Sequence, residues 1–144
     1  MTIEQLLERI KEEEGFSPLS FWDNDQWTWG YGTKAPGGPG YPINKERAEQ
    51  DLEGELWEAI EDYKVLFDCD PPGLTEARME SILSMIFNLG RTKFAKFKNM
   101  NRYIKEGNWE KAAFHARNSL WYNQVGRRSK RIVKEFDTGE HQTI

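Results

Sequence analysis

The amino-acid sequence predicts an α+β fold, with a small antiparallel sheet near the N-terminus and a larger helical region after it. Two patterns carry this prediction. Aromatic and small residues alternate in one short stretch, and helical apolar stripes recur through most of the remaining chain. The 144 residues are enough for one domain with its own core. No apolar stretch approaches the ~20 residues that a membrane-spanning helix needs.

The first helix is marked at both ends. Thr2 and Gln5 have the spacing of a capping box, and Gly15 suits the position just beyond a helix end. The apolar stripe between them consists of Ile3, Leu6, Leu7 and Ile10.

The alternating stretch over 27–33 predicts a strand, and Asn24–Gln26 before it resembles a turn, so we expect a hairpin. The aromatic residues of this strand would share one face, which is typical of a core. Close approach by a flat sugar ligand would suit the opposite face, which carries only the small residues Thr28, Gly30 and Gly32.

Helices are predicted for most of the remaining chain. Asn44 can cap a helix that runs to about Phe67 and spans roughly 34 Å. Thr75 can cap a second helix that is apolar nearly all round and closes at Gly90. Shorter helices are expected over about 98–106, over about 109–117 after an Asn108 cap, and over about 126–137, with a turn near 120–123.

Charge is distributed unevenly along the chain. Residues 1–70 contain 6 Lys or Arg and 17 Asp or Glu, whereas residues 71–144 contain 14 and 7. This asymmetry argues against a simple nucleic-acid-binding protein, because a basic surface would then dominate the whole. With one cysteine, Cys69, and two histidines, we expect no disulfide, no metal site and no cofactor.

Carboxylates in two places are candidates for acid–base chemistry. Glu12–Glu14 occupy the last turn of the first helix, where like charges and the negative helix end favour the protonated form of a carboxyl group. A solvated acidic helix end is the alternative. Asp23, before the hairpin turn, supplies a second carboxylate, and glycoside hydrolysis needs such a pair. The Thr28 hydroxyl could hold a water molecule beside Asp23.

Together these residues resemble the phage-type lysozymes of glycoside hydrolase family 24, including the T-even type. Glu14-Gly15 is followed by Asp23 after eight intervening residues, and then by Thr28 leading into Trp29–Gly32. The resemblance continues in order through the stretches Ser84–Gly90, Trp109–Ala113, Ser119–Gln124, Arg127–Arg131 and Phe136–Gly139. Several motifs at consistent spacing form a more specific signal than one short motif.

The resemblance implies a lysozyme-like fold, one domain over 1–144. It implies a sheet lobe over about 15–58, a helical lobe formed by 1–14 with about 68–144, a bridging helix over about 45–67, and a cleft between the lobes. It also implies cleavage of the β-1,4 bond between N-acetylmuramic acid and N-acetylglucosamine in peptidoglycan, with inversion.

Specific roles follow from the resemblance. Glu14 would be the general acid, and Asp23 with Thr28 would position and activate the water. Arg128 would pair with Glu14, and Arg131 with Glu13. Substrate contacts are expected from Lys34, Phe87, Asn88, Met100, His115 and Gln124.

The sequence also departs from the T-even type. The stretch between Asp23 and Thr28 is one residue shorter, and Thr33 stands where the family often has His. These changes leave the catalytic groups in place and bear on substrate range.

The expected partner is the peptidoglycan glycan strand, bound by a monomer without nucleic acid and without stable membrane insertion. No signal sequence is visible, so we expect the host cytoplasm, with access to the wall after holin-type permeabilisation. Alternatives are a transglycosylase that forms anhydro products, and a non-catalytic peptidoglycan-binding or structural module. Exposed Trp22 and Trp57 would favour the module, but we expect both to be packing residues.

Overall fold

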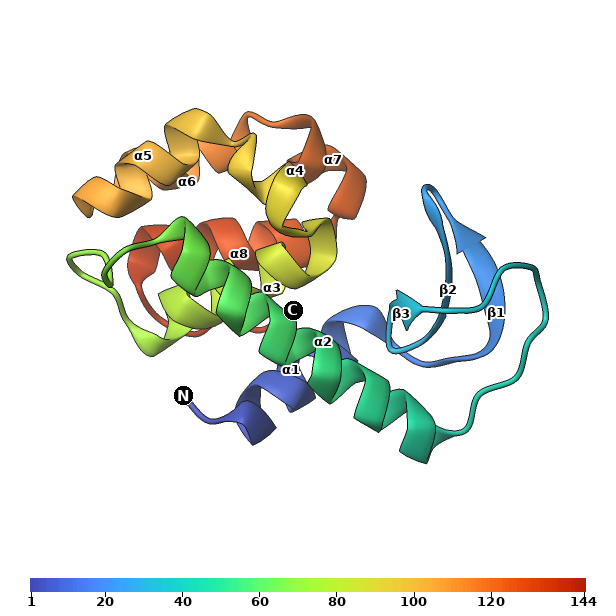
Figure 1. Ribbon diagram of the computed structural model, residues 1–144. Helices are drawn as coiled ribbons and strands as arrows, with labels where there is room; N and C mark the ends of the chain where they lie inside the picture. The colour runs from blue at the N-terminus through green and yellow to red at the C-terminus, as the bar shows by residue number, and fades with distance from the viewer. The chain divides into compact units, whose positions relative to one another are not determined.

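The computed structural model describes all 144 residues as eight helices and three strands (Figure 1). The predicted α+β class is confirmed. In chain order the elements are α1 (Ile3–Glu14), β1 (Ser17–Asp23), β2 (Gln26–Gly30), β3 (Thr33–Lys34), α2 (Lys45–Leu66), α3 (Glu76–Leu89), α4 (Arg91–Ala95), α5 (Lys98–Glu106), α6 (Trp109–Arg117), α7 (Leu120–Val125) and α8 (Arg127–Thr138).

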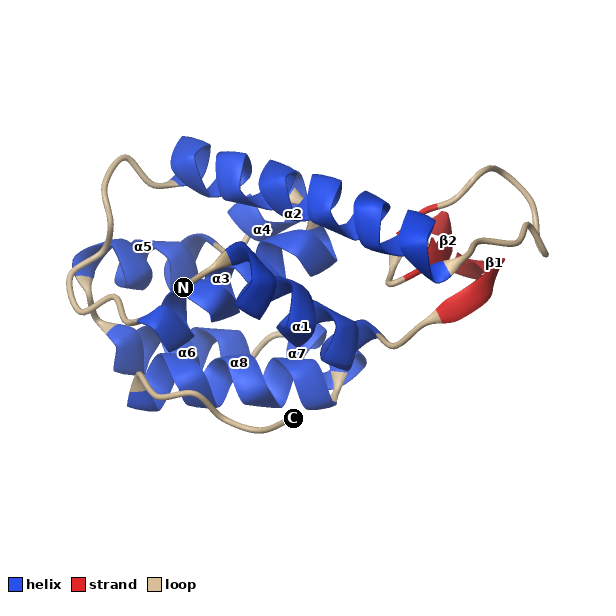
Figure 2. Cartoon of the chain, turned by 90° about the horizontal axis from the view of Figure 1, so that it is seen from below, coloured by secondary structure: helices blue, strands red, loops and turns tan.

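The chain forms two compact units, unit 1 over Met1–Glu58 and unit 2 over Ala59–Ile144, and the boundary falls within α2. All strands belong to unit 1, and they are drawn in red in Figure 2. Residues 1–14 fall in unit 1 with the sheet, and the lobe boundaries implied by the resemblance stay predictions. The contacts of Lys11 explain the place of residues 1–14, because its ammonium pairs with Glu49 of α2 and lies 5.6 Å from the centre of the Tyr31 ring.

The sheet of unit 1 has the strand order β1-β2-β3, and both pairings are antiparallel. The strand predicted over 27–33 is interrupted, because Gly32 donates its N–H to the carbonyl of Trp29 at 3.1 Å and closes a turn. Strand β3 then begins at Thr33. The expected aromatic core is confirmed: Trp29, Ala35, Ile43 and Ala48 are buried together, with Phe16, Trp27 and Tyr31 packed against them.

Side-chain caps set the starts of the main helices. The capping box of Thr2 and Gln5 is present, and Asn44 accepts a hydrogen bond from the backbone N–H of Arg47 at 2.8 Å. Thr75 and Asn108 cap α3 and α6 as predicted. These short-range contacts satisfy the free N–H groups of the first turn.

Unit 2 packs its helices around α3, whose middle is buried nearly all round. Its core is joined to a buried polar network at the C-terminus. Glu135 of α8 accepts hydrogen bonds from the Ser81 hydroxyl at 2.5 Å and from the backbone N–H of Gln142 at 3.0 Å. His141 contacts Glu80 at 2.9 Å. These contacts hold the residues after α8 against α3.

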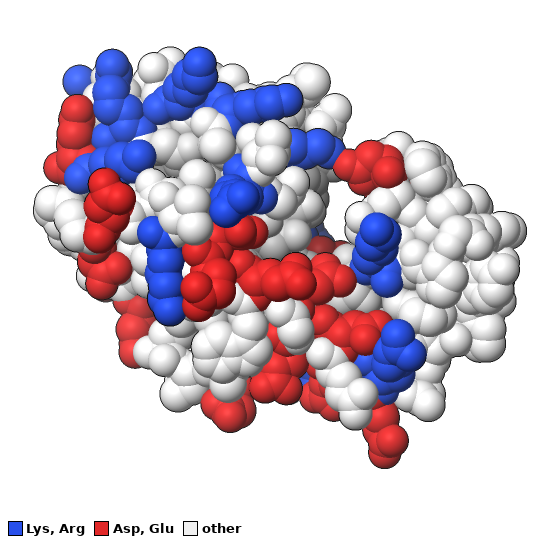
Figure 3. All heavy atoms as spheres, in the orientation of Figure 1, with Lys and Arg blue, Asp and Glu red and all other residues white.

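Charge gathers over particular elements. On the face drawn in Figure 3, acidic side chains gather over α2. Basic side chains gather over α4 and α5, whose cations are Arg91, Lys93, Lys98, Arg102 and Lys105. Cys69 is a free, exposed thiol in the connection after α2. None of the helices combines the length and apolar character that a membrane-spanning segment requires.

Candidate active site

Glu14 is the last residue of α1, and its carboxylate lies against the turn between β2 and β3. A Cβ atom placed on Gly32 would lie 2.6 Å from Oε2 of Glu14 and 2.7 Å from its Cδ. Gly32 also has φ +84°, which L side chains rarely adopt. The turn therefore needs glycine here, and the glycine provides the space that the Glu14 carboxylate fills.

Asp23, Thr28 and Lys34 lie on one face of the sheet. Asp23 ends β1 opposite Gln26, and Thr28, in the central strand, is opposite Lys34 of β3. Directly opposed residues share a face, and residues two apart on a strand return to the same face. The sheet therefore brings together three of the residues predicted for the site.

The hydroxyl of Thr28 is buried without a hydrogen-bond partner. Thr28 is 2% exposed, and its Oγ1 contacts no donor or acceptor. An unsatisfied buried hydroxyl costs about 1–3 kcal/mol, so such groups are rare unless they have another purpose. Its position on the Asp23 face suits the role of holding a water molecule.

The glycine positions of this hairpin are filled by protein. A Cβ on Gly30 would lie 2.9 Å from Cβ of Ala48 in α2, and Gly32 is covered by Glu14. The expectation that a flat sugar lies on these two glycines is therefore wrong, because helix packing and Glu14 occupy the space.

The acidic end of α1 is not uniformly solvated. The side chain of Glu13 is fully buried and pairs with Nε of Arg9 at 3.1 Å, whereas Glu12 is exposed. In unit 2, Arg128 is buried, and Nε of Arg131 lies 3.5 Å from Glu135. The pairs Glu14–Arg128 and Glu13–Arg131 would join the two units and remain predictions.

The other predicted substrate contacts belong to unit 2. Asn88, after partly buried Phe87 in α3, accepts a hydrogen bond from Nε1 of Trp121 at 3.0 Å. His115 stacks on the ring of Tyr103 with 5.4 Å between centres. Gln124 is exposed on α7, whereas Met100 is 1% exposed. Their contacts with substrate stay predictions.

Two tryptophans are more exposed than expected. Trp22 and Trp57 are 56% and 50% exposed, so the expectation that both are packing residues is wrong. Trp22 lies near the end of β1, opposite Trp27, and makes an edge contact with that ring at 5.5 Å. Its remaining ring surface is open to solvent.

Glu55 of α2 lies beside the candidate site through its contact with Lys34, and it was not predicted from the sequence. It is partly buried, and Oε2 accepts a hydrogen bond from the backbone N–H of Lys34 at 3.1 Å. Burial, with Glu58, Asp51 and Glu14 nearby, raises the pKa of Glu55 to about 7, although the Lys34 hydrogen bond opposes the shift. Glu55 lies three residues after buried Leu52 and one before buried Leu56. This position beside the apolar stripe of the helix was the sequence signal that could have identified it.

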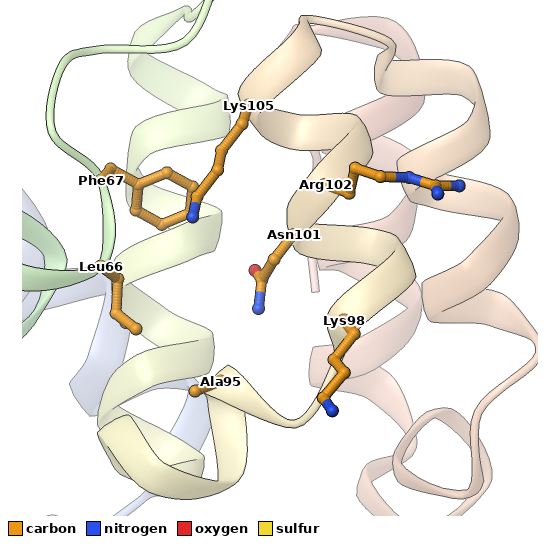
Figure 4. A pocket seen from close by; sticks show the side chains of 7 residues that line it. All are labelled: Leu66, Phe67, Ala95, Lys98, Asn101, Arg102 and Lys105. Atoms are coloured by element: carbon orange, nitrogen blue, oxygen red, sulfur yellow. The ribbon is translucent and has the colours of Figure 1, made fainter.

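Unit 2 also contains a pocket of about 340 Å³ (Figure 4). Lys105 extends over the ring of Phe67, with its ammonium 5.6 Å from the ring centre, whereas Arg102 points away from the pocket. None of the predicted site residues lines this pocket, whose walls are Leu66, Phe67, Ala95, Lys98, Asn101, Arg102 and Lys105.

The arrangement in unit 1 offers carboxylates and a hydroxyl for acid–base chemistry. Glu14 ends a helix and Asp23 ends a strand, while Thr28 has an unused buried hydroxyl. No group of three or more His, Cys, Asp or Glu side chains is arranged to hold a metal ion. Two carboxyl groups of this kind can supply the acid and the base that glycosidic bond cleavage requires.

The chain belongs to the phage lysozyme family, whose model matches residues 11–135. Two of the proteins with similar sequences show how far the likeness extends. "Probable T4-type lysozyme 2" of Dictyostelium discoideum is 35% identical over 66 residues, which are 46% of this chain and 39% of that protein. The pre-baseplate central spike protein Gp5 of Enterobacteria phage T4 is 32% identical over 110 residues, 75% of this chain and 19% of that protein. The chain thus spans about two fifths of the first relative's length and about one fifth of the second's.

Proposed function

We propose that this protein hydrolyses the β-1,4 bond between N-acetylmuramic acid and N-acetylglucosamine in bacterial peptidoglycan, and so lyses a host cell. One arrangement carries the proposal: Glu14 packs on Gly32, while Asp23 and the unpartnered hydroxyl of Thr28 share one sheet face. The supporting family match includes all three residues.

Each residue has a distinct role in this mechanism. Glu14 donates a proton to the leaving glycosidic oxygen, and Asp23 accepts a proton from the attacking water. Thr28 orients that water through its hydroxyl. Attack on the face opposite the leaving group inverts the anomeric carbon.

The test compares the wild type with Glu14→Gln on bacteria whose outer membrane has been permeabilised. Loss of a general acid lowers the rate about 10²- to 10⁴-fold, so turbidity should fall with the wild type and stay almost constant with Glu14→Gln. Glu12→Gln is the matched control, because Glu12 lies exposed on the same helical turn, and it should lyse cells normally. Full activity of Glu14→Gln would exclude the role given to Glu14.

The chemistry of the product gives a second test. Nuclear magnetic resonance of the first product should show the inverted anomer. A retained anomer would exclude the role of Asp23 as the base for water. An anhydro product, lighter by one water, would identify a transglycosylase instead.

A binding module is a second candidate, and the open rings of Trp22 and Trp57 favour it. Aromatic rings on a surface can stack on sugars. Such a module would sediment with peptidoglycan and release no soluble fragments. Release of fragments by the wild type but not by Glu14→Gln would exclude this candidate.

A further inference from the structure

Glu55 contacts the short β-strand that lies next to two residues of the proposed site. We propose that Glu55 is a positioning residue: its carboxylate holds the segment 31–34 where Gly32 supports Glu14 and Lys34 faces Thr28. This inference rests on the proposed lysozyme function and adds to it a residue outside the acid–base group.

The hydrogen bond from Lys34 to Glu55 joins α2 to the edge of the sheet. In an antiparallel pair, successive N–H groups point alternately toward and away from the neighbouring strand. Ala35 donates to the carbonyl of Trp27 at 2.9 Å, so the N–H of Lys34 points away from β2. Such outward groups on edge strands usually bind water. Here Oε2 of Glu55 accepts that hydrogen bond at 3.1 Å instead.

The strand β3, whose Lys34 N–H is bound by Glu55, lies next to two parts of the proposed site. Lys34 is directly opposite Thr28, and Gly32, two residues earlier, is packed against the Glu14 carboxylate. A shift of β3 would therefore move the support of Glu14 and the neighbour of Thr28 together. Misplacement of a reacting group by about 1 Å can cost 10²-fold in rate.

The charges around Glu55 make this contact sensitive to pH. Glu14 faces it from α1, Asp51 and Glu58 lie on its own helix, and β3 supplies the backbone N–H of Lys34. Glu55 makes no ion pair. Because burial and these acidic neighbours raise its pKa to about 7, both protonation forms are populated near neutral pH. An ionised carboxylate accepts an N–H more strongly than a neutral acid does.

The raised pKa of Glu55 also distinguishes a functional role of this residue from a structural one. The folded protein keeps a proton on Glu55 that the unfolded chain, with an ordinary pKa of 4.5, releases between pH 4.5 and about 7. Stability from this group therefore falls as pH rises through that window and stays low above it. Glutamine would accept the same hydrogen bond without that cost, so stability alone does not explain a carboxylate here.

The experiment compares wild type, Glu55→Gln and the control Glu53→Gln, an exposed position on the same helix. Peptide N–H chemical shifts of Lys34 and Gly32 are followed from about pH 5 to 9, with the lysis rate and the melting temperature. In the wild type both N–H signals should titrate near pH 7, and the lysis rate should rise about fivefold through the same midpoint.

In Glu55→Gln both titrations should disappear. Above pH 7 its lysis rate should be about fivefold below that of the wild type, although its melting temperature should be higher. Glu53→Gln should behave as the wild type. The gain in stability with a loss of rate is a result that a merely structural role would not produce.

The outcomes separate this inference from the proposed function. If the wild type releases no peptidoglycan fragments, the proposed function is wrong and the positioning role falls with it. If the wild type is active but Glu55→Gln keeps the same N–H titrations or the same pH–rate profile, only the role of Glu55 is overturned. Should Glu55→Gln not fold, Glu55→Asp keeps the charge with a shorter reach, and an unchanged pH–rate profile in that variant would also overturn the role.

Discussion

Units 1 and 2 each contain a helical carboxylate that is shielded from solvent, but the two carboxylates differ in their hydrogen-bond partners and charged neighbours. Glu135 in unit 2 accepts from Ser81 and from the N–H of Gln142, and lies 3.5 Å from Arg131. Glu55 in unit 1 accepts one backbone N–H and has three acidic neighbours. A buried charge with several partners fixes a structure, whereas one with few partners costs stability and points to a function.

Buried hydroxyl groups show the same contrast. Ser129 in unit 2 lies 2.6 Å from the carbonyl of Tyr122 and 2.8 Å from that of Gly126, which fixes the start of α8. In unit 1 the hydroxyls of Thr28 and Thr33 are buried without partners. The buried hydroxyl groups without partners therefore lie in the unit that holds the proposed acid–base residues.

The largest expected effect comes from removing the satisfied carboxylate. Glu135→Ala should lower the free energy of unfolding by about 3 kcal/mol, because it strips Ser81, Gln142 and Arg131 of a shared acceptor. Urea denaturation measures this, with Glu140→Ala, an exposed neighbour, as the control that should change stability by less than about 0.5 kcal/mol. A fall of under about 1 kcal/mol for Glu135→Ala would remove the distinction between the two carboxylates.

A medium effect is expected at the turn that supports Glu14. Gly32→Ala places a methyl group 2.6 Å from the Glu14 carboxylate at φ +84°, and should cost about 1–3 kcal/mol in stability. The lysis rate of the folded variant should fall at least about tenfold, because Glu14 must move. Gly37→Ala is the matched control, since its added methyl group meets nothing within 4 Å and its φ is not positive. Equal lysis rates for the two variants would show that Gly32 does not position Glu14.

The smallest change in stability is expected at Thr28. Thr28→Val keeps the shape but removes the unpartnered hydroxyl, so the protein should be stabilised by up to about 1 kcal/mol while its lysis rate falls. Thr28→Ser keeps the hydroxyl and should retain more activity than Thr28→Val. Thermal unfolding and turbidity assays on the same samples measure both effects. A Thr28→Val protein with full activity would show that the buried hydroxyl has no catalytic use.

Features set by nearby residues could be predicted from the sequence. The caps at Thr2, Asn44, Thr75 and Asn108 depend on contacts three residues away, and all four helices begin where these residues predict. The short helix α4 was missed because it has five residues and no side-chain cap. Its formation depends on burial of Phe94 rather than on a local signal.

The candidate site was predictable only in part, because some of its features depend on contacts between residues far apart in the sequence. The resemblance supplied Glu14, Asp23 and Thr28 as candidates, and the strand register puts the last two on one face. The alternation over 27–33 hid the turn at Gly32, because a glycine in a strand and a glycine in a turn look alike in sequence. Glu55 was one of many acidic residues on α2, and only its burial and its long-range contact with Lys34 set it apart.

The exposed thiol of Cys69 has a practical consequence for handling and labelling the protein. A maleimide dye would attach at one position of the native chain, in the connection between α2 and α3, without any substitution. The same exposure allows air oxidation to link two copies through a disulfide, so we expect a covalent dimer in aged preparations and none in the presence of a reductant. Non-reducing gel electrophoresis would detect it.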